Sequence, residues 1–136
     1  MSMSIADAES LLRGSFAPWI QDMGIRFDGI GPGEAVLRVP PSERLYRAGG
    51  TFCGQAIMAL ADTALVFAVS SLTGGLVPMT TVSLNTTFLR PATPGDLIAA
   101  ASIIRKGRSI IYGEVNLHGG DAAKPVAHVT STYMLL

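Results

Sequence analysis

The segment "GTFCGQAIMALADTALVFAV", Gly50 to Val69, decides the fold of this chain. From about Gly54 to Leu72 the residues are good helix formers without an internal glycine or proline, and "TGG" follows, which predicts one long helix. The helix is apolar nearly all round, which is typical of a buried central helix. Asp62 is the one charged residue in the quoted segment, and the segment holds no histidine, lysine or arginine to pair with it.

An isolated carboxylate in an apolar helix is costly to desolvate, by about several kcal/mol, unless it is paired or solvated. Three interpretations of Asp62 stay open from the residues alone. In the first, Asp62 has a structural role and accepts a hydrogen bond, for example from a backbone amide of another subunit. In the second, it lies on a solvated edge of the helix. The third is a functional role, as a general base or nucleophile in a partly apolar cleft.

The residues after this helix predict strands. In "MTTVSLNTTFLRP" apolar and polar residues alternate, which places one set on each face of a strand. "DLIAAASIIRKGRSIIYGEVNLHGG" predicts two strands joined near "RKGR", and "KPVAHVTSTYMLL" predicts a last one. The two expected faces of the first strand are Val82, Leu84, Thr86 and Phe88 on one side, and Thr81, Ser83, Asn85 and Thr87 on the other.

The residues before the helix predict a short helix and a hairpin. Ser4 is the expected N-cap and Gly14 the expected end of the short helix. Residues 25–30 and 34–39 form the hairpin around "GPG". A breaker-rich loop with Arg44 and Arg47 follows. One long helix wrapped by a mostly antiparallel sheet of five to six strands fits this order, so we expect an α+β fold.

Composition narrows the classes of partner. The chain has 136 residues, enough for one domain, of which 49% are hydrophobic and 15% charged. About a quarter of the residues of a typical protein are charged. A small domain with so little charge hides more surface than its own core needs, so we expect a homo-oligomer. Ten basic and ten acidic residues cancel, which argues against nucleic acid or an anionic membrane as the main partner.

Cysteine and histidine usage argues against metal and disulfide chemistry. Cys53 is the single cysteine, and His118 and His128 are far from it in sequence and fit no metal-ligand spacing. The N-terminus lacks the pattern of a signal peptide, and the longest apolar run, 56–72, is too short and too polar for a membrane span. We therefore expect a cytoplasmic protein.

Three further features carry candidate chemistry. "GGTFCGQ" precedes the helix, whose free N–H groups attract a developing oxyanion, with Gly54 as the candidate donor; the alternative is an ordinary turn glycine. Cys53 fits a small buried hydrophobe better than a nucleophile, because no histidine is near it in sequence. "RKGR" is a solvated hairpin turn or a phosphate contact.

Together these segments resemble the PaaI-type hotdog-fold thioesterases, within the 4-hydroxybenzoyl-CoA thioesterase-like superfamily. The resemblance rests on "GTFCGQAIMALADTA", "TTVSLNTTFLRPATPGDLIAAASIIRKGR" and "PVAHVTSTYML". The family pattern is approximately G-x-x-H-G-G, six residues, then Asp, so Gly54 keeps the first glycine and Asp62 the acid. The resemblance covers roughly Gly24 to Leu136, most of the chain. We expect a single hotdog domain over residues 1–136, with residues 1–20 as an N-terminal helical extension.

The resemblance also implies a function. The reaction is hydrolysis of an acyl-CoA thioester by a dimer or a dimer of dimers, with CoA as part of the substrate and no cofactor. The Gly54 N–H would polarise the carbonyl, the partner's acid at position 62 would activate water or attack directly, and Thr81 would orient the water. Expected substrate-binding residues are Cys53, Gln55, Arg47, Asn85, Arg90, Arg105, Lys106, Gly107 and Arg108.

The chain departs from the family pattern at three positions. Cys53 replaces the histidine, Gln55 the second glycine, and Arg47 an asparagine. Gln55 lies two helical turns before Asp62 on the same face and could bind the acid, the water or the substrate. Two alternatives to hydrolysis are a non-catalytic acyl-CoA-binding protein and a hotdog dehydratase or hydratase, which would need a histidine at the site.

Overall fold

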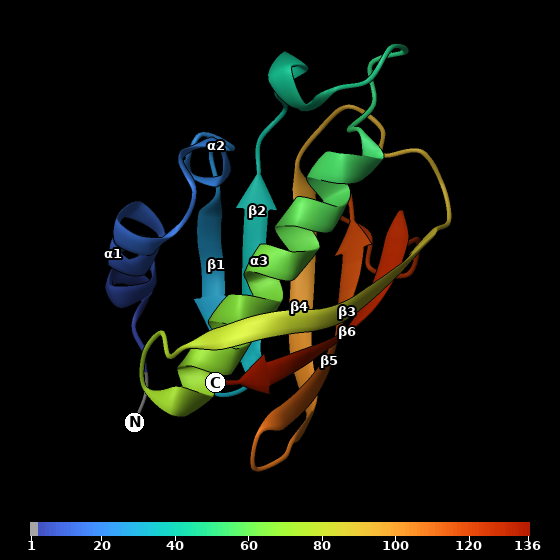
Figure 1. Ribbon diagram of the computed structural model, residues 1–136. Helices are drawn as coiled ribbons and strands as arrows, with labels where there is room; N and C mark the ends of the chain where they lie inside the picture. Colours follow the sequence, from blue (N-terminus) through green and yellow to red (C-terminus); the bar gives the residue numbers. More distant parts are fainter. Residues whose placement is uncertain (1–2) are drawn as a thin grey trace.

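A six-stranded antiparallel sheet wraps around one long helix, α3 (Gly54–Thr73), in the computed structural model, which describes residues 3–136 (Figure 1). The predicted α+β arrangement is therefore confirmed. The core lies between α3 and the inner face of the sheet and is built from aliphatic side chains such as Leu37, Leu65 and Val115, each fully buried.

Helix α3 has the predicted limits to within one residue. Cys53 is the N-cap, and Gly74 ends the helix in the left-handed conformation at φ 77°, which glycine adopts without steric cost. The helix is long and apolar enough to cross a membrane by length and composition, so the expectation that its apolar run is too short and too polar for a span is wrong. However, 67% of its apolar window is buried inside the fold. That burial is the pattern of a core helix, as the apolar sequence predicts.

The order of strands in the sheet is β1-β2-β4-β5-β6-β3, and each neighbouring pair is antiparallel. The strand that follows α3 therefore crosses to the far edge and pairs with the last strand. The predicted hairpin and the later strands are confirmed. Their bounds are β1 (Arg26–Ile30), β2 (Glu34–Val39), β3 (Met79–Phe88), β4 (Leu97–Lys106), β5 (Ile110–His118) and β6 (Ala127–Leu135).

The predicted alternation along β3 is wrong at its start. A β-bulge at Val82 shifts the register, so that Thr81 pairs with Tyr133 and Leu84 with Ser131. Tyr133 and Ser131 are both buried, which places Thr81 and Leu84 together on the face toward α3. The physical reason is that one extra residue in a strand inverts the alternation beyond it.

Two short helices precede the sheet, α1 (Ile5–Ser15) and α2 (Pro18–Gln21), and a 3-10 turn, η1 (Glu43–Leu45), precedes α3. The predicted Ser4 cap is confirmed as a capping box with Asp7, and the pKa of Asp7 is lowered by the hydrogen bond from the Ser4 backbone. The predicted end at Gly14 is one residue early, and α2 and η1 were not predicted.

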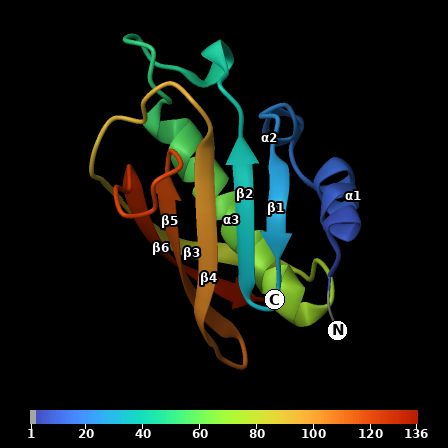
Figure 2. The same ribbon diagram turned by 180° about the vertical axis from the view of Figure 1, so that it is seen from behind.

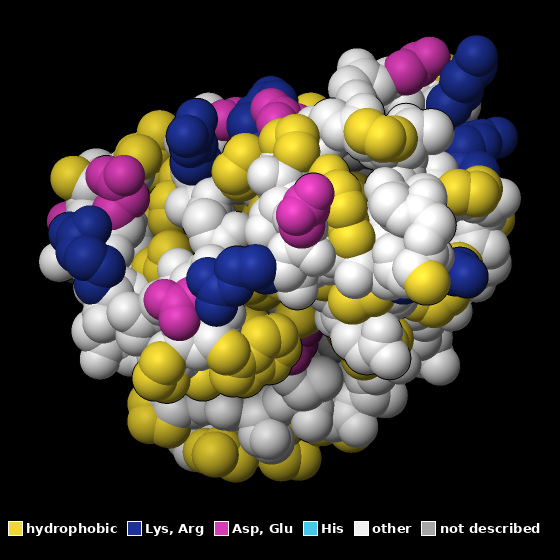
Figure 3. Space-filling view, turned by 90° about the horizontal axis from the view of Figure 1, so that it is seen from above, with side chains coloured by type: hydrophobic (Ala, Val, Ile, Leu, Met, Phe, Trp, Pro, Cys, Tyr) yellow, Lys and Arg dark blue, Asp and Glu magenta, His cyan; other side chains and the backbone are white. Residues whose placement is uncertain are grey.

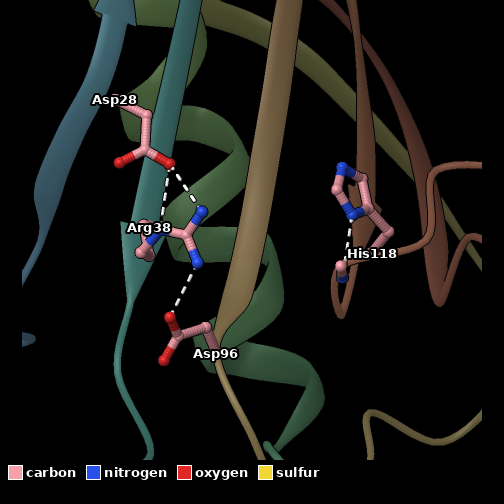
Figure 4. A network of polar contacts seen from close by, with 5 residues as sticks. Asp28, Arg38, Asp96 and His118 are labelled. Carbon is pink, nitrogen blue, oxygen red and sulfur yellow. Dashed lines mark hydrogen bonds and ion pairs between the residues drawn. The ribbon is translucent and has the colours of Figure 1, made fainter.

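Figure 2 shows the outer face of the sheet from behind. Ion pairs join neighbouring strands on this face. Arg38 on β2 contacts Asp28 of β1 at 2.8 Å and Asp96, just before β4, at 2.7 Å (Figure 4). These pairs raise the pKa of Arg38, with Asp28 as the larger cause. The groups are about one-third exposed, so we assign them a small share of the stability.

Candidate active site

The Asp62 carboxylate is held by side chains from two strands. Its Oδ1 accepts a hydrogen bond from the Tyr133 hydroxyl at 2.6 Å and another from the Thr81 hydroxyl at 3.2 Å. Among the described residues, 3–136, no hydrogen bond is donated to Oδ2. The arrangement fixes one carboxylate oxygen and leaves the other available to water or substrate.

Tyr133 was missed in the sequence, although its position on the buried face of the last strand could have signalled it. A buried tyrosine hydroxyl needs a partner, and an acid in an apolar helix needs a donor. Tyr133 has no exposed surface. Burial, and then the charge of Asp62 and the hydrogen bond to it, raise the pKa of Tyr133 well above its ordinary value. The phenol therefore remains a donor at neutral pH.

Thr81 reaches the acid because of the bulge in β3. Its pairing with Tyr133 brings the two hydroxyl groups to the same carboxylate oxygen. The sequence predicts Thr81 as a site residue but places it on the wrong face of β3. A strand without the bulge would turn Thr81 away from α3.

The N-terminus of α3 presents free backbone donors. The Ala56 N–H donates to the Cys53 thiol at 3.4 Å, and the Ile57 N–H to the Cys53 carbonyl at 3.2 Å. Within the described part of the chain the N–H groups of Gly54 and Gln55 donate to no protein acceptor. Cys53 thus serves as a helix cap, and the two free N–H groups could bind a carbonyl oxygen.

A cavity of about 420 Å³ opens beside these donors. Arg47 and Arg90 both line it, with Gly54 and Phe88. A Cβ built on Gly54 would lie 3.1 Å from the tip of the Phe88 ring, so this glycine allows a close approach of the ring to the helix. Arg90 also donates to the Pro125 carbonyl at 2.7 Å, which holds its side chain beside the cavity.

Gly54 and Asp62 of one protomer are separated along the helix. Eight residues at a rise of about 1.5 Å each place them about 12 Å apart. One carbonyl group cannot contact a donor and a base at that distance. A site using both groups therefore needs the donor of one protomer and the acid of another.

Other expected site residues lie elsewhere. Gln55 is exposed and is not among the donors to Asp62. Asn85 pairs with Thr130, on the outer face of the sheet. Residues 105–108 lie at the end of β4 and in the turn to β5, at the opposite end of the sheet from the start of α3 (Figure 1). Within one protomer the structure brings neither Asn85 nor residues 105–108 to Gly54, and Gln55, which follows Gly54 in α3, makes no hydrogen bond to Asp62.

Charge is dispersed on the end of the molecule where α3 begins. In Figure 3 basic side chains lie between acidic and apolar ones and form no continuous basic field. The arginines of the cavity are therefore a local feature. Such an arrangement suits a small anionic group better than a polyanion.

Both histidines lie away from Asp62. His128 pairs with Glu114 at 2.9 Å, and His118 accepts a hydrogen bond from the Gly120 N–H at 3.0 Å. Among residues 3–136 no group of three or more histidine, cysteine or acidic side chains is arranged to hold a metal. The chemistry available at Asp62 is that of a carboxylate with hydroxyl partners.

Known proteins resemble this chain in sequence and structure. The profile of the thioesterase superfamily matches residues 49–126, more than half of the chain. A candidate esterase of Thermoplasma acidophilum is 37% identical over 90 residues, which cover 63% of this chain and 64% of that protein. The matched part thus spans less than two thirds of that relative's length.

Solved structures of other proteins have a similar fold. A mutant of the phenylacetic acid degradation protein PaaI from Thermus thermophilus superposes with a TM-score of 0.77 at 26% identity, covering 88% of this chain and 100% of the other. Zebrafish thioesterase superfamily member 2 superposes with a TM-score of 0.87 at 22% identity, covering 99% and 100%, which supports the fold alone. With its long helix wrapped by a six-stranded sheet, the chain has the hotdog fold and belongs to the thioesterase superfamily.

Proposed function

We propose that this protein hydrolyses acyl-CoA thioesters to a carboxylic acid and free CoA, at a site formed by two copies of the chain. The observation that carries the proposal is the Asp62 carboxylate, held at Oδ1 by Tyr133 and Thr81 with Oδ2 available. Family membership supports thioester chemistry. The 12 Å separation estimated above supports a homodimer or a dimer of dimers.

The reaction follows from these groups. The Gly54 N–H of one protomer donates to the thioester carbonyl oxygen and stabilises its developing negative charge. Asp62 of the other protomer takes a proton from water, whose oxygen attacks the carbonyl carbon. The C–S bond then breaks and the CoA sulfur leaves as a thiolate that gains a proton. Direct attack by Asp62, giving a mixed anhydride that water then cleaves, uses the same geometry.

Arg47 and Arg90 suit the phosphate groups of CoA. Both line the cavity beside Gly54, and a guanidinium group binds phosphate with two parallel hydrogen bonds. CoA is therefore placed on the protomer that supplies the N–H donor. Arg105, Lys106 and Arg108 could contribute only from another protomer.

A first experiment tests hydrolysis itself. Purified protein is incubated with short-chain, long-chain and aryl acyl-CoAs, and thiol release is followed for wild type and Asp62→Asn. Loss of the base lowers kcat by about 10²–10⁴-fold. Unchanged turnover in Asp62→Asn would contradict the role of the acid.

The replacement of the family histidine by Cys53 favours a second candidate, a non-catalytic acyl-CoA-binding protein. If the protein only binds acyl-CoA, the same assay gives no thiol release on any thioester, while CoA binding, measured by calorimetry, is retained.

A second experiment tests the shared site. Gly54→Pro removes the N–H at the first position of α3, where proline is tolerated, and the extended backbone of Cys53 suits a following proline. Gly54→Ala is the matched control, because both variants place a Cβ against Phe88 and only proline removes the donor. We expect Gly54→Pro to lower kcat by about 10²–10³-fold and Gly54→Ala to retain most activity.

Mixed dimers then show which protomer supplies each group. A heterodimer of one Gly54→Pro chain and one Asp62→Asn chain has one site with both groups intact, if the groups come from different chains. We expect about half of the wild-type activity from two subunits that are inactive as homodimers. An inactive heterodimer would mean that both groups act within one protomer.

A further inference from the structure

A second cavity, of about 560 Å³, lies further along α3 and has Asp62 in its wall. One side of it comes from the N-terminal helices and the segment between them, and the other side from α3. Leu84 of β3 also lines it. Its other apolar lining residues include Phe16, Trp19, Ile20, Met58, Ala59 and Val66.

The lining suits an uncharged chain. Asp62 is the one ionisable side chain among the lining residues that the structure describes. Thr63 donates its hydroxyl to the Ala59 carbonyl, so its donor is already used within the helix. The cavity beside Gly54 carries two arginines instead. The two cavities on one α3 therefore suit opposite ends of an acyl-CoA molecule.

The walls of the Asp62 cavity are held in different ways. Phe16 stacks on Phe67 of α3 with ring centroids 5.1 Å apart, and Phe27 meets the same ring edge-on at 4.7 Å. This aromatic cluster fixes the segment between α1 and α2 against the core. Trp19, in contrast, is 60% exposed and forms the outer rim, where a ligand could cover it.

The cavity also continues beyond Asp62. A neighbouring hollow of about 480 Å³ shares Ser15, Phe16 and Val66 with it and runs to Leu76 and Met79. The apolar surface therefore follows α3 toward its C-terminus. A short acyl group such as acetyl would leave most of this surface unused.

We propose that the Asp62 cavity holds the acyl chain, and that one thioester lies across two protomers. CoA then lies on the protomer that supplies Gly54, and the acyl chain on the protomer that supplies Asp62. This inference rests on the function proposed above and adds the substrate class: thioesters of medium and long aliphatic acids without a charged tail. The volume of the Asp62 cavity is within the range of about 300–1,000 Å³ typical of small-ligand sites.

Substrate preference gives the first test. Wild type is assayed with acetyl-, octanoyl-, palmitoyl-, phenylacetyl- and succinyl-CoA. We expect the highest kcat/KM for octanoyl- or palmitoyl-CoA and the lowest for succinyl-CoA, whose carboxylate would be buried near Asp62. A preference for succinyl- or acetyl-CoA would overturn the inference, and a preference for phenylacetyl-CoA would overturn the aliphatic class.

The position of the acyl chain is tested with the mixed dimer. Ala59→Phe fills the cavity and is placed either in the Gly54→Pro chain, which supplies the working Asp62, or in the Asp62→Asn chain. In the first arrangement kcat/KM for octanoyl-CoA should fall about tenfold or more while that for acetyl-CoA changes little. The second arrangement is the matched control. In it, kcat/KM for octanoyl-CoA and for acetyl-CoA should both equal those of the parent heterodimer without Ala59→Phe.

The outcomes separate this inference from the function on which it rests. An inactive parent heterodimer contradicts the two-protomer site. An active parent that loses octanoyl-CoA turnover equally in both arrangements, or only in the second, overturns the placement of the acyl chain. If Ala59→Phe instead converts the dimer to monomer in size-exclusion chromatography, the cavity is a contact between copies and the inference is wrong.

Trp19→Ala provides a variant that is safer for folding, because this side chain is largely exposed. When Trp19→Ala is placed in the chain that supplies Asp62, loss of the rim should lower the ratio of octanoyl-CoA to acetyl-CoA turnover severalfold. An unchanged ratio in both placements would overturn the assignment of this cavity to the acyl chain.

Discussion

At the scale of single residues, the Asp62 carboxylate depends on Tyr133, which lies 71 positions away in the chain. The acid is in the segment that decides the fold, while its closest donor is near the C-terminus. Tyr133 also lies outside the part matched by the thioesterase superfamily profile. We therefore regard Tyr133 as a positioning residue that fixes one oxygen of the acid.

We expect Tyr133→Phe to lower kcat about ten- to hundredfold with little change in KM. A hydrogen bond to a charged group contributes about 1.5–3 kcal/mol, and each 1.4 kcal/mol corresponds to about tenfold in rate. The measurement is a double-mutant cycle with Asp62→Asn. Since Tyr133 acts through the acid, its substitution should have almost no further effect in the Asp62→Asn background.

Tyr112→Phe is the matched control, because it removes a hydroxyl from a tyrosine that is 40% exposed and lies on the outer face of the sheet. It should leave kcat unchanged. Equal losses from Tyr133→Phe in both backgrounds would indicate a general structural effect instead of positioning of Asp62.

At the scale of elements, Leu65 of α3 packs closely against Gly113 of β5. A Cβ on Gly113 would lie 2.7 Å from Cδ2 of Leu65 and 3.0 Å from the Ser102 carbonyl oxygen. Real Cβ atoms do not approach other atoms so closely. A glycine at this position therefore sets how near the helix and the sheet can pack.

We expect Gly113→Ala to lower the free energy of unfolding by about 1–3 kcal/mol, because overpacking forces the helix or the strand to shift. Denaturant titration followed by circular dichroism measures the change. Gly29→Ala on β1 is the control, since a Cβ there meets no atom within 4 Å. Similar losses from both substitutions would contradict the packing explanation.

At the scale of the whole molecule, the raised pKa of Tyr133 predicts how stability depends on pH. Below the ordinary tyrosine pKa of 10.0 the phenol is protonated in both states, so its contribution is constant. Above it the unfolded chain loses a proton that the folded chain keeps, and the free energy of unfolding falls as pH rises.

We therefore expect a steeper loss of stability above about pH 10 in wild type than in Tyr133→Phe, by up to about 1.4 kcal/mol per pH unit. Urea titrations at a series of alkaline pH values compare the two proteins. Identical slopes would show that the folded protein does not hold Tyr133 in its protonated form.

Much of the fold could be predicted because its signals are local. Helix formers between Gly54 and the "TGG" sequence, and alternating residues in the later strands, determine each element over a few neighbouring positions. The position of α2 was missed because four residues give too weak a pattern. The division into a domain and an extension at residue 20 stays a prediction.

The sequence by itself determined the long buried helix, the strands and the Ser4 cap, because propensity and periodicity act between near neighbours. Asp62 and Gly54 became expected site residues through the resemblance to the family pattern. Only the tertiary structure decided that β3 pairs with β6, that a bulge turns Thr81 toward α3, and that Tyr133 contacts Asp62. It also placed Arg47 and Arg90 at one cavity and Asn85 on the other face of the sheet. These features depend on packing between distant segments, where register and burial outweigh local preference.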